Sequence, residues 1–113
     1  MCYPNDTKLL FDLAKSNNLW QRRIAIIATL YFIKQGHFQV TLALSELLIS
    51  DEHDLMHKAV GWMLREMGKQ DQQPLLLFLE QFSHVMPRTM LRYAIEKLPK
   101  STRQDYMQRK GKQ

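Results

Sequence analysis

One stretch of the chain combines cations with an aromatic residue at the spacing of a single helical face. Its members are separated by 4, 3 and 4 residues: Lys58, Trp62, Arg65 and Lys69. On a helix this spacing places them on one side, where cations can meet phosphate groups and an indole can lie against a sugar or a base. A second interpretation stays open, in which Trp62 packs inward and the cations are only solvated, because tryptophan is often buried.

A similar group lies at the start of an apolar segment. Trp20 and Arg23 are three residues apart, and Arg22 and Arg23 directly precede the nearly all-apolar run 24–33. If this run is a helix, both guanidinium groups lie near its N-terminus, where a phosphate group binds well. Arg22 has a plainer alternative role, which is to keep the end of an apolar helix in water.

Motifs for metal binding and nucleophilic catalysis are missing. His53 and His57 are four residues apart, but no H-E-x-x-H pattern supplies a further ligand, so two surface histidines are the better interpretation. The sequence has no G-x-S-x-G, P-loop or G-x-G-x-x-G motif. We therefore expect no metal site.

The composition of the 113 residues narrows the class of protein. Hydrophobic residues make up 45% and charged residues 24%, an ordinary balance for a globular chain that argues against general disorder. The single cysteine cannot form an internal disulfide, no apolar run reaches the roughly 18 residues of a membrane span, and no signal peptide is visible. We expect one cytoplasmic domain over residues 1–113 with no membrane partner.

Positive charge is concentrated towards the C-terminus. Residues 1–87 hold 8 Lys or Arg and 9 Asp or Glu, whereas residues 88–113 hold 8 and 2. Arg88 and Arg92 begin this basic segment. The asymmetry indicates an anionic partner, although a solvated basic tail explains the same charges.

The elements that would position these residues are helices. Leucine is the commonest residue, valine occurs three times, and no long stretch alternates apolar and polar residues with a period of two. Short connections make consecutive helices antiparallel neighbours. Capping and breaking residues predict the following helices: from Asn5 or Asp6 to Lys15, 19–35 between Asn18 and Gly36, 39–50, from Asp51 or His53 to Gly68, one capped by Asp71, one from Pro87 to before Pro99, and a last frayed turn or two from Ser101.

A weak internal repeat indicates how these helices are arranged. Segments 23–26, 57–60 and 92–95 share the form basic-x-Ala-aliphatic, with alanines 34 and 35 residues apart. This period is typical of stacked helix pairs, whose small residues let neighbouring backbones approach. We expect an all-α solenoid of stacked antiparallel helix pairs over residues 1–98, followed by a basic, partly frayed tail over 99–113. An ordinary helix bundle is the alternative.

Three motifs together resemble a known family. Residues 18–26 (NLWQRRIAI), 58–69 (KAVGWMLREMGK) and 87–95 (PRTMLRYAI) are similar to the AlkD-type DNA alkylation-repair glycosylases, and the similarity covers about residues 8–98. The resemblance implies HEAT-like helix pairs with a concave, basic face for duplex DNA. It also implies excision of N3- or N7-alkylated purines without a metal or an organic cofactor.

The resemblance implies residue roles as well. Arg23 matches the family's active-site arginine at the DNA backbone of the lesion, and Trp62 matches a tryptophan that contacts the lesion nucleotide. Lys58 and Arg65 lie in the same motif, with structural or phosphate-facing roles. The predicted DNA-binding residues are Trp20, Arg22, Arg23, Lys58, Arg65, Lys69, Arg88 and Arg92.

The chain departs from this family in its length. Family members are about twice as long, and their catalytic aspartate lies on a helix pair upstream of the W-x-R-R motif, where this chain has only 19 residues before Trp20. Asp6 and Asp12 lie in no matching motif. We therefore expect the C-terminal half of a glycosylase, lacking the catalytic aspartate and binding DNA without efficient excision. The alternative is a non-catalytic helical-repeat module that binds DNA or protein.

A stack without an upstream neighbour would leave apolar side chains uncovered. Leu9, Leu13, Ile24 and Tyr31 belong to this surface in the first two predicted helices. Contiguous exposed apolar patches usually mark an interface, so we expect a homodimer through the N-terminal helices. If residues 1–16 instead fold back as a cap, the chain is a monomer.

Overall fold

The computed structural model describes the backbone of residues 3–109 and the side chains of residues 8–108. Cys2, Lys110 and Lys112, and the side chains of Asn5 and Asp6, lie outside the described part. Seven helices and no strands occupy the described residues: α1 (Tyr3–Ala14), α2 (Leu19–Lys34), α3 (Gln39–Leu48), α4 (Asp54–Gln70), α5 (Gln72–Phe82), α6 (Arg88–Ile95) and α7 (Lys100–Arg109). The predicted all-α class is confirmed. None of these helices is long and apolar enough to cross a membrane.

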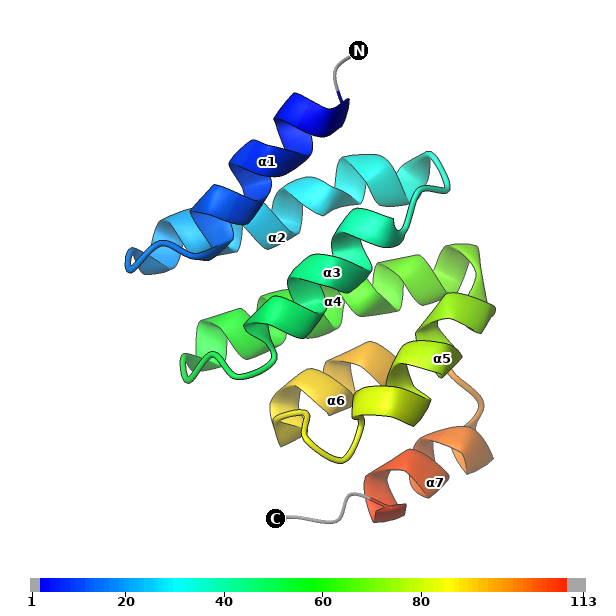
Figure 1. Ribbon diagram of the computed structural model, residues 1–113. Helices are drawn as coiled ribbons and strands as arrows, with labels where there is room; N and C mark the ends of the chain where they lie inside the picture. The colour runs from blue at the N-terminus through cyan, green and yellow to red at the C-terminus, as the bar shows by residue number, and fades with distance from the viewer. Residues whose placement is uncertain (1–2, 110–113) are drawn as a thin grey trace.

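The helices stack in two layers (Figure 1). α2, α4 and α6 form a rear layer, in which α4 contacts both of its neighbours. α1, α3 and α5 form a front layer, in which α1 packs on α2, α3 packs on α2 and α4, and α5 packs on α4. Consecutive helices run antiparallel, which confirms the predicted stack of helix pairs.

Small residues bring the rear helices together. The three alanines of the internal repeat, Ala25, Ala59 and Ala94, are buried in α2, α4 and α6 respectively. The closest approach is at Gly61, where an added Cβ would lie 2.5 Å from the Cβ of Tyr93 and 2.6 Å from the backbone oxygen of Met90. α4 and α6 therefore meet at a point that accommodates only glycine without a shift.

Capping residues define several helix ends as predicted. The side-chain oxygen of Asn18 accepts hydrogen bonds from the backbone N–H groups of Trp20 (2.9 Å) and Gln21 (3.1 Å) at the start of α2. Asp71 caps α5 in the same way. Gly36 follows α2 with a φ of +81°, and two backbone bonds back into the helix complete a Schellman motif.

Gly68 has a different role from the predicted helix end. α4 continues past it to Gln70, and the N–H of Asp71 still bonds the carbonyl of Met67 at 2.9 Å. A Cβ on Gly68 would lie 2.5 Å from Cδ2 of Leu75 on α5. This glycine therefore permits close packing of α5 on α4, and the prediction that it terminates the helix is wrong.

The C-terminal segment differs most from the sequence-based expectation. Lys100–Arg109 form the ten-residue helix α7 where the sequence predicts a partly frayed tail. Tyr106 is 3% exposed, and its hydroxyl donates a hydrogen bond to Oε2 of Glu80 on α5 at 2.7 Å. Met107 also packs against the core. These two side chains anchor an otherwise polar helix to the stack.

Candidate nucleic-acid interface

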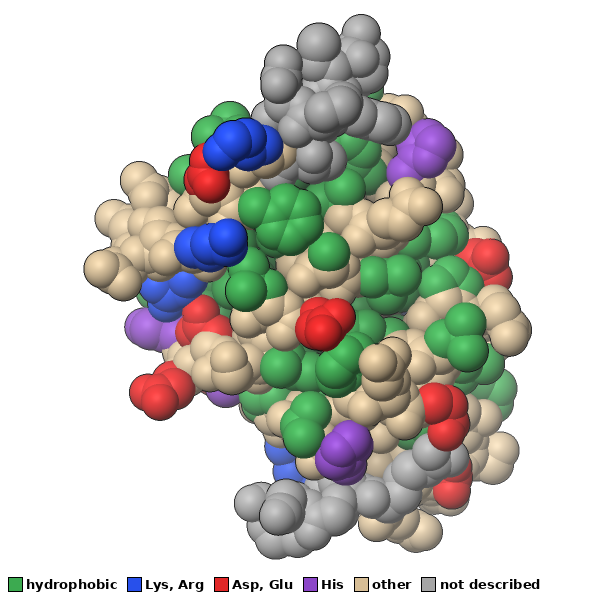
Figure 2. Space-filling model, in the orientation of Figure 1, with side chains coloured by type: hydrophobic (Ala, Val, Ile, Leu, Met, Phe, Trp, Pro, Cys, Tyr) green, Lys and Arg blue, Asp and Glu red, His purple; other side chains and the backbone are tan. Residues whose placement is uncertain are grey.

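The front face of the molecule has no continuous basic surface. In Figure 2, its visible Lys and Arg side chains lie near the left and lower edges, whereas acidic and apolar side chains are spread across the middle. The predicted DNA-binding residues belong instead to α2, α4 and α6 of the rear layer. The exposed sides of these three helices are therefore the surface on which an anionic partner would bind.

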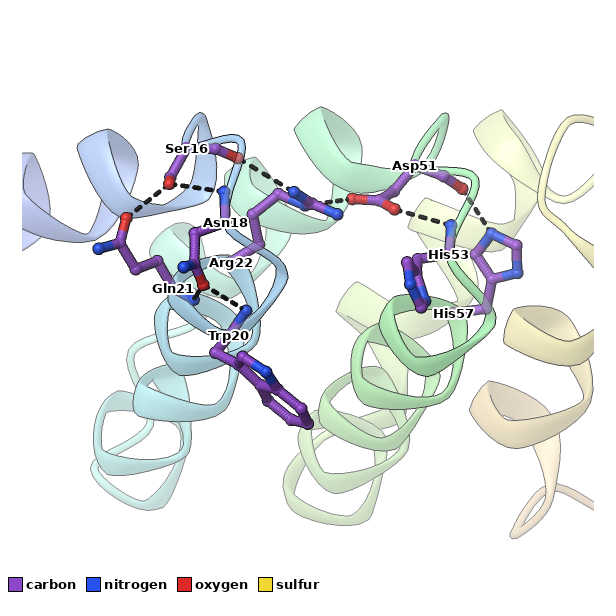
Figure 3. A network of polar contacts seen from close by, with 8 residues as sticks. All are labelled: Ser16, Asn18, Trp20, Gln21, Arg22, Asp51, His53 and His57. Atoms are coloured by element: carbon purple, nitrogen blue, oxygen red, sulfur yellow. Dashed lines mark hydrogen bonds and ion pairs between the residues drawn. The ribbon is translucent and has the colours of Figure 1, made fainter.

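On α2, an exposed indole lies beside a free guanidinium. Trp20 is 61% exposed, and its ring points into the space between α2 and α4 (Figure 3). Trp20 and Arg23 line an open pocket of about 370 Å³, whose other walls are Ile24, Ile27 and Ala28. Within the described part of the chain, Arg23 has no hydrogen bond or ion pair, so its donors are available to a ligand.

Arg22 lies next to Arg23 in the sequence but serves the fold. Its Nε donates to Oδ2 of Asp51 at 2.7 Å, and its Nη1 donates to the backbone oxygen of Ser16 at 3.1 Å (Figure 3). The side chains of Arg22 and Asp51 are only 16% and 9% exposed. Arg22 thus ties the turn before α2 to the turn before α4, a structural role that differs both from phosphate binding and from keeping a helix end in water.

Asp51 organises the second of these turns. Its Oδ1 accepts the backbone N–H of His53 at 2.9 Å, and its carbonyl oxygen lies 2.5 Å from Nε2 of His57. The backbone of His53 and the ring of His57 thus both contact Asp51 in the turn that leads into α4 (Figure 3). Across the residues that the structure describes, no three His, Cys, Asp or Glu side chains gather where a metal ion could be held.

The α4 stripe consists of Lys58, Trp62, Arg65 and Lys69, and both interpretations of its tryptophan hold in part. Trp62 is partly buried and packs against the core, while the remainder of its surface is open to solvent. Lys58 and Lys69 are exposed on the same helix, and Arg65 is half-buried between them. The stripe therefore presents two exposed cations around an indole that packs against the core.

Each cation of the α4 stripe already has an acidic neighbour. Lys58 pairs with Asp54 at 3.4 Å, and Lys69 pairs with Glu66 at 3.3 Å. Exposed pairs of this kind contribute about 0–1 kcal/mol, so a phosphate group can replace either carboxylate at little cost. Both pairs join residues about one helical turn apart on α4. This spacing in the sequence indicates ion pairs, which the DNA-binding interpretation did not consider.

Arg65 is held more firmly. It pairs through Nη1 with Glu96, just beyond the end of α6, and its side chain is 20% exposed. Its Nε is buried and has no hydrogen-bond partner in the described residues. Arg65 thus links α4 to α6 and has less freedom to meet an external ligand than Lys58 or Lys69.

α6 contributes two further free cations. Arg88 and Arg92 are exposed, lie one helical turn apart, and have no ion-pair partner among residues 8–108. Together with Arg23 they give unpaired guanidinium groups on both helices that flank α4. The sequence assigned all three residues to DNA binding, and that assignment stays a prediction.

A comparison with protein-family models decides the family. Residues 1–98 match the model described as DNA alkylation repair enzyme. The chain belongs to this family. The matched residues include all of α1 to α6, whereas α7 lies beyond them. Searches of curated proteins and of solved structures gave no match.

Proposed function

We propose that this member of the DNA alkylation repair enzyme family binds duplex DNA on the exposed side of its rear layer, around an N3- or N7-alkylated purine. The observation that carries the proposal is the unpaired guanidinium of Arg23 beside the exposed indole of Trp20. A guanidinium suits a backbone phosphate, and an indole suits a sugar or base. HEAT-like curvature of the stack would bring the rear helices around the duplex.

The aromatic residues on this side suit a cationic base. Alkylation at N3 or N7 gives a purine ring a positive charge, and the faces of tryptophan rings attract cations. Trp20 projects from α2, and Trp62 is fixed against the core on α4. We assign Arg23 to the phosphate at the lesion and the two tryptophans to the nucleotide.

Excision of the base also needs a free carboxylate near the deoxyribose, and the described residues meet this need poorly. Cleavage of the N-glycosidic bond builds positive charge on the deoxyribose, and a nearby free carboxylate stabilises that charge. α2 has no acidic residue, and the described carboxylates on the α4 and α6 side pair with cations: Asp54 with Lys58, Glu66 with Lys69 and Glu96 with Arg65. We therefore propose that this chain alone binds lesions and releases alkylated bases slowly or not at all.

Fluorescence anisotropy with a labelled duplex that contains one 7-methylguanine tests the binding step. Affinity should fall as salt rises, with a slope of log K against log salt near −0.9 per phosphate contact, or roughly −3.6 for about four contacts. Arg23→Ala should reduce this slope by about one unit. Lys8→Ala removes an equal charge from α1 and should leave the slope unchanged. Affinity that does not depend on salt contradicts the proposal.

The catalytic part of the proposal is tested separately by chromatography of the released base. When the wild-type chain is incubated with the same duplex, the amount of free 7-methylguanine should not exceed the amount released without protein. Robust release that Asp54→Asn abolishes would identify a working carboxylate on α4 and overturn this part.

A second candidate function rests on exposed apolar side chains. Leu9 and Ile24 are 57% exposed, and Tyr31 is 53% exposed. These residues of α1 and α2 favour a non-catalytic role in protein binding, with the predicted homodimer as its simplest form. The two candidates compete for part of the same surface, since Ile24 also lines the pocket beside Trp20 and Arg23.

A further inference from the structure

A pocket outside the predicted DNA-binding set lies between α6 and α7. It has a volume of about 490 Å³ and is lined by Arg92, Tyr93, Ile95, Glu96, Arg103 and Met107. Arg103 and Met107 belong to α7, which lies beyond the residues that match the family model. The pocket thus depends on a helix that the sequence did not predict as a stable element.

The polar wall of this pocket is positively charged. Arg92 has no acidic partner in the described chain, and the Nε of Arg103 is buried without a hydrogen-bond partner there. A buried N–H donor that lacks a partner is unfavourable. Glu96 is the single acidic residue in the lining, and its carboxylate is already paired with Arg65 from α4. Two guanidinium groups therefore face the pocket without compensating charge.

α7 is fixed well enough to maintain this arrangement. The buried hydroxyl of Tyr106 bonds Glu80 on α5 at 2.7 Å, one helical turn beyond Arg103. Met107 packs against the core and also forms part of the pocket wall. Arg103 therefore lies on a packed helix, in the wall of the pocket that Arg92 also lines, and does not belong to a solvated tail.

We propose that the pocket between α6 and α7 binds a phosphate group of a DNA strand through Arg92 and Arg103. Two guanidinium groups can donate several charge-assisted hydrogen bonds to phosphate oxygens. The apolar side chains of Ile95 and Met107 provide a surface for the adjoining deoxyribose. The assignment of the phosphate to DNA rests on the proposed function, whereas recognition of the phosphate group itself does not.

The Nε–H resonances of arginine in a ¹H–¹⁵N NMR spectrum of the full chain test the pocket. Inorganic phosphate should shift the signals of Arg92 and Arg103, and a labelled duplex should shift them as well. Arg103→Gln should abolish the response of Arg92 to inorganic phosphate. Lys97→Gln removes the same charge from the same segment without altering the pocket lining, and it should retain that response. The proposal is overturned if the wild type shows no such shifts, or if the shifts are equal in the two variants.

DNA affinity then identifies the source of the phosphate. Arg103→Gln should weaken duplex binding about fivefold and lower the salt slope by about one unit, whereas Lys97→Gln should change affinity less than about twofold. If inorganic phosphate shifts the two signals while Arg103→Gln leaves DNA affinity unchanged, the DNA assignment is overturned. Because Arg103 packs in part against the fold, Arg92→Gln is the second variant, at an exposed position: it should abolish the response of Arg103 to inorganic phosphate and weaken duplex binding to a similar extent. Arg23→Ala reports on the proposed function independently of this pocket.

Discussion

Gly61→Ala tests the contact between α4 and α6 that positions the rear layer. The new Cβ would lie 2.5 Å from the Cβ of Tyr93 and 2.6 Å from the backbone oxygen of Met90. Neither atom is the end of a flexible side chain, so α4 and α6 must move apart. Overpacking of this kind typically costs about 1–3 kcal/mol, while alanine gains about 0.5–1 kcal/mol over glycine in a helix. We expect a net loss of about 1–2 kcal/mol.

Urea and thermal unfolding, followed by circular dichroism at a helical wavelength, measure this loss. For a chain of this size, about 1–2 kcal/mol corresponds to a melting temperature roughly 4–8 °C lower. Gly68→Ala is the matched control, because its Cβ would meet only Cδ2 of Leu75, the flexible end of a side chain. That variant should lose clearly less stability than Gly61→Ala, because the end of the Leu75 side chain can shift more easily than the backbone of α6. A Gly61→Ala protein as stable as the wild type would refute the close contact and the placement of Arg65 that depends on it.

Three further predictions concern charge and association. Arg22→Ala leaves Asp51, whose side chain is 9% exposed, without its cation, so the free energy of unfolding in urea should fall by about 2 kcal/mol; an unchanged value would mean that the pair contributes nothing. Asp54→Asn removes the carboxylate that competes with phosphate for Lys58 and should raise duplex affinity about threefold at low salt. Asp12→Asn removes an equally exposed carboxylate from an ion pair on α1 and should have no effect; equal changes in the two variants count against the assigned face. Sedimentation velocity at micromolar concentration should detect a dimer that a Leu9→Ser, Tyr31→Ser variant converts to monomer, and a monomeric wild type would disprove it.

The sequence predicted those helix ends that local chemistry determines. Asn18 caps α2 through its own side chain, and Gly36 ends α2 because its φ is positive. Gly68 was mispredicted because a glycine that ends a helix and a glycine that admits a neighbour look the same in sequence. Only the presence of Leu75 on α5 distinguishes the two roles. α7 is longer and better packed than the predicted frayed turn or two, because Tyr106 anchors an otherwise polar segment.

The candidate site was predictable in its residue types and only partly in its pairing. An indole beside a guanidinium at Trp20 and Arg23 follows from their spacing on one helix. The bond from Arg22 to Asp51 joins residues 29 positions apart, and the pair of Arg65 with Glu96 spans 31 positions. No local pattern reveals such contacts, because they arise from the stacking of successive helix pairs. The pocket at Arg103 depends in the same way on how α7 docks.

The central claim is that duplex DNA covers the exposed side of the rear layer, and tryptophan fluorescence tests it most directly. The chain has two tryptophans, Trp20 and Trp62, and both lie on this side. Trp62→Phe leaves Trp20, which is 61% exposed, as the single reporter of quenching by acrylamide. Bound duplex should shield this indole and lower its quenching, and Arg23→Ala should weaken the protection together with the affinity measured by anisotropy. Binding of the duplex with no change in the quenching of Trp20, or of Trp62 in the Trp20→Phe variant, would place the DNA elsewhere and contradict the account.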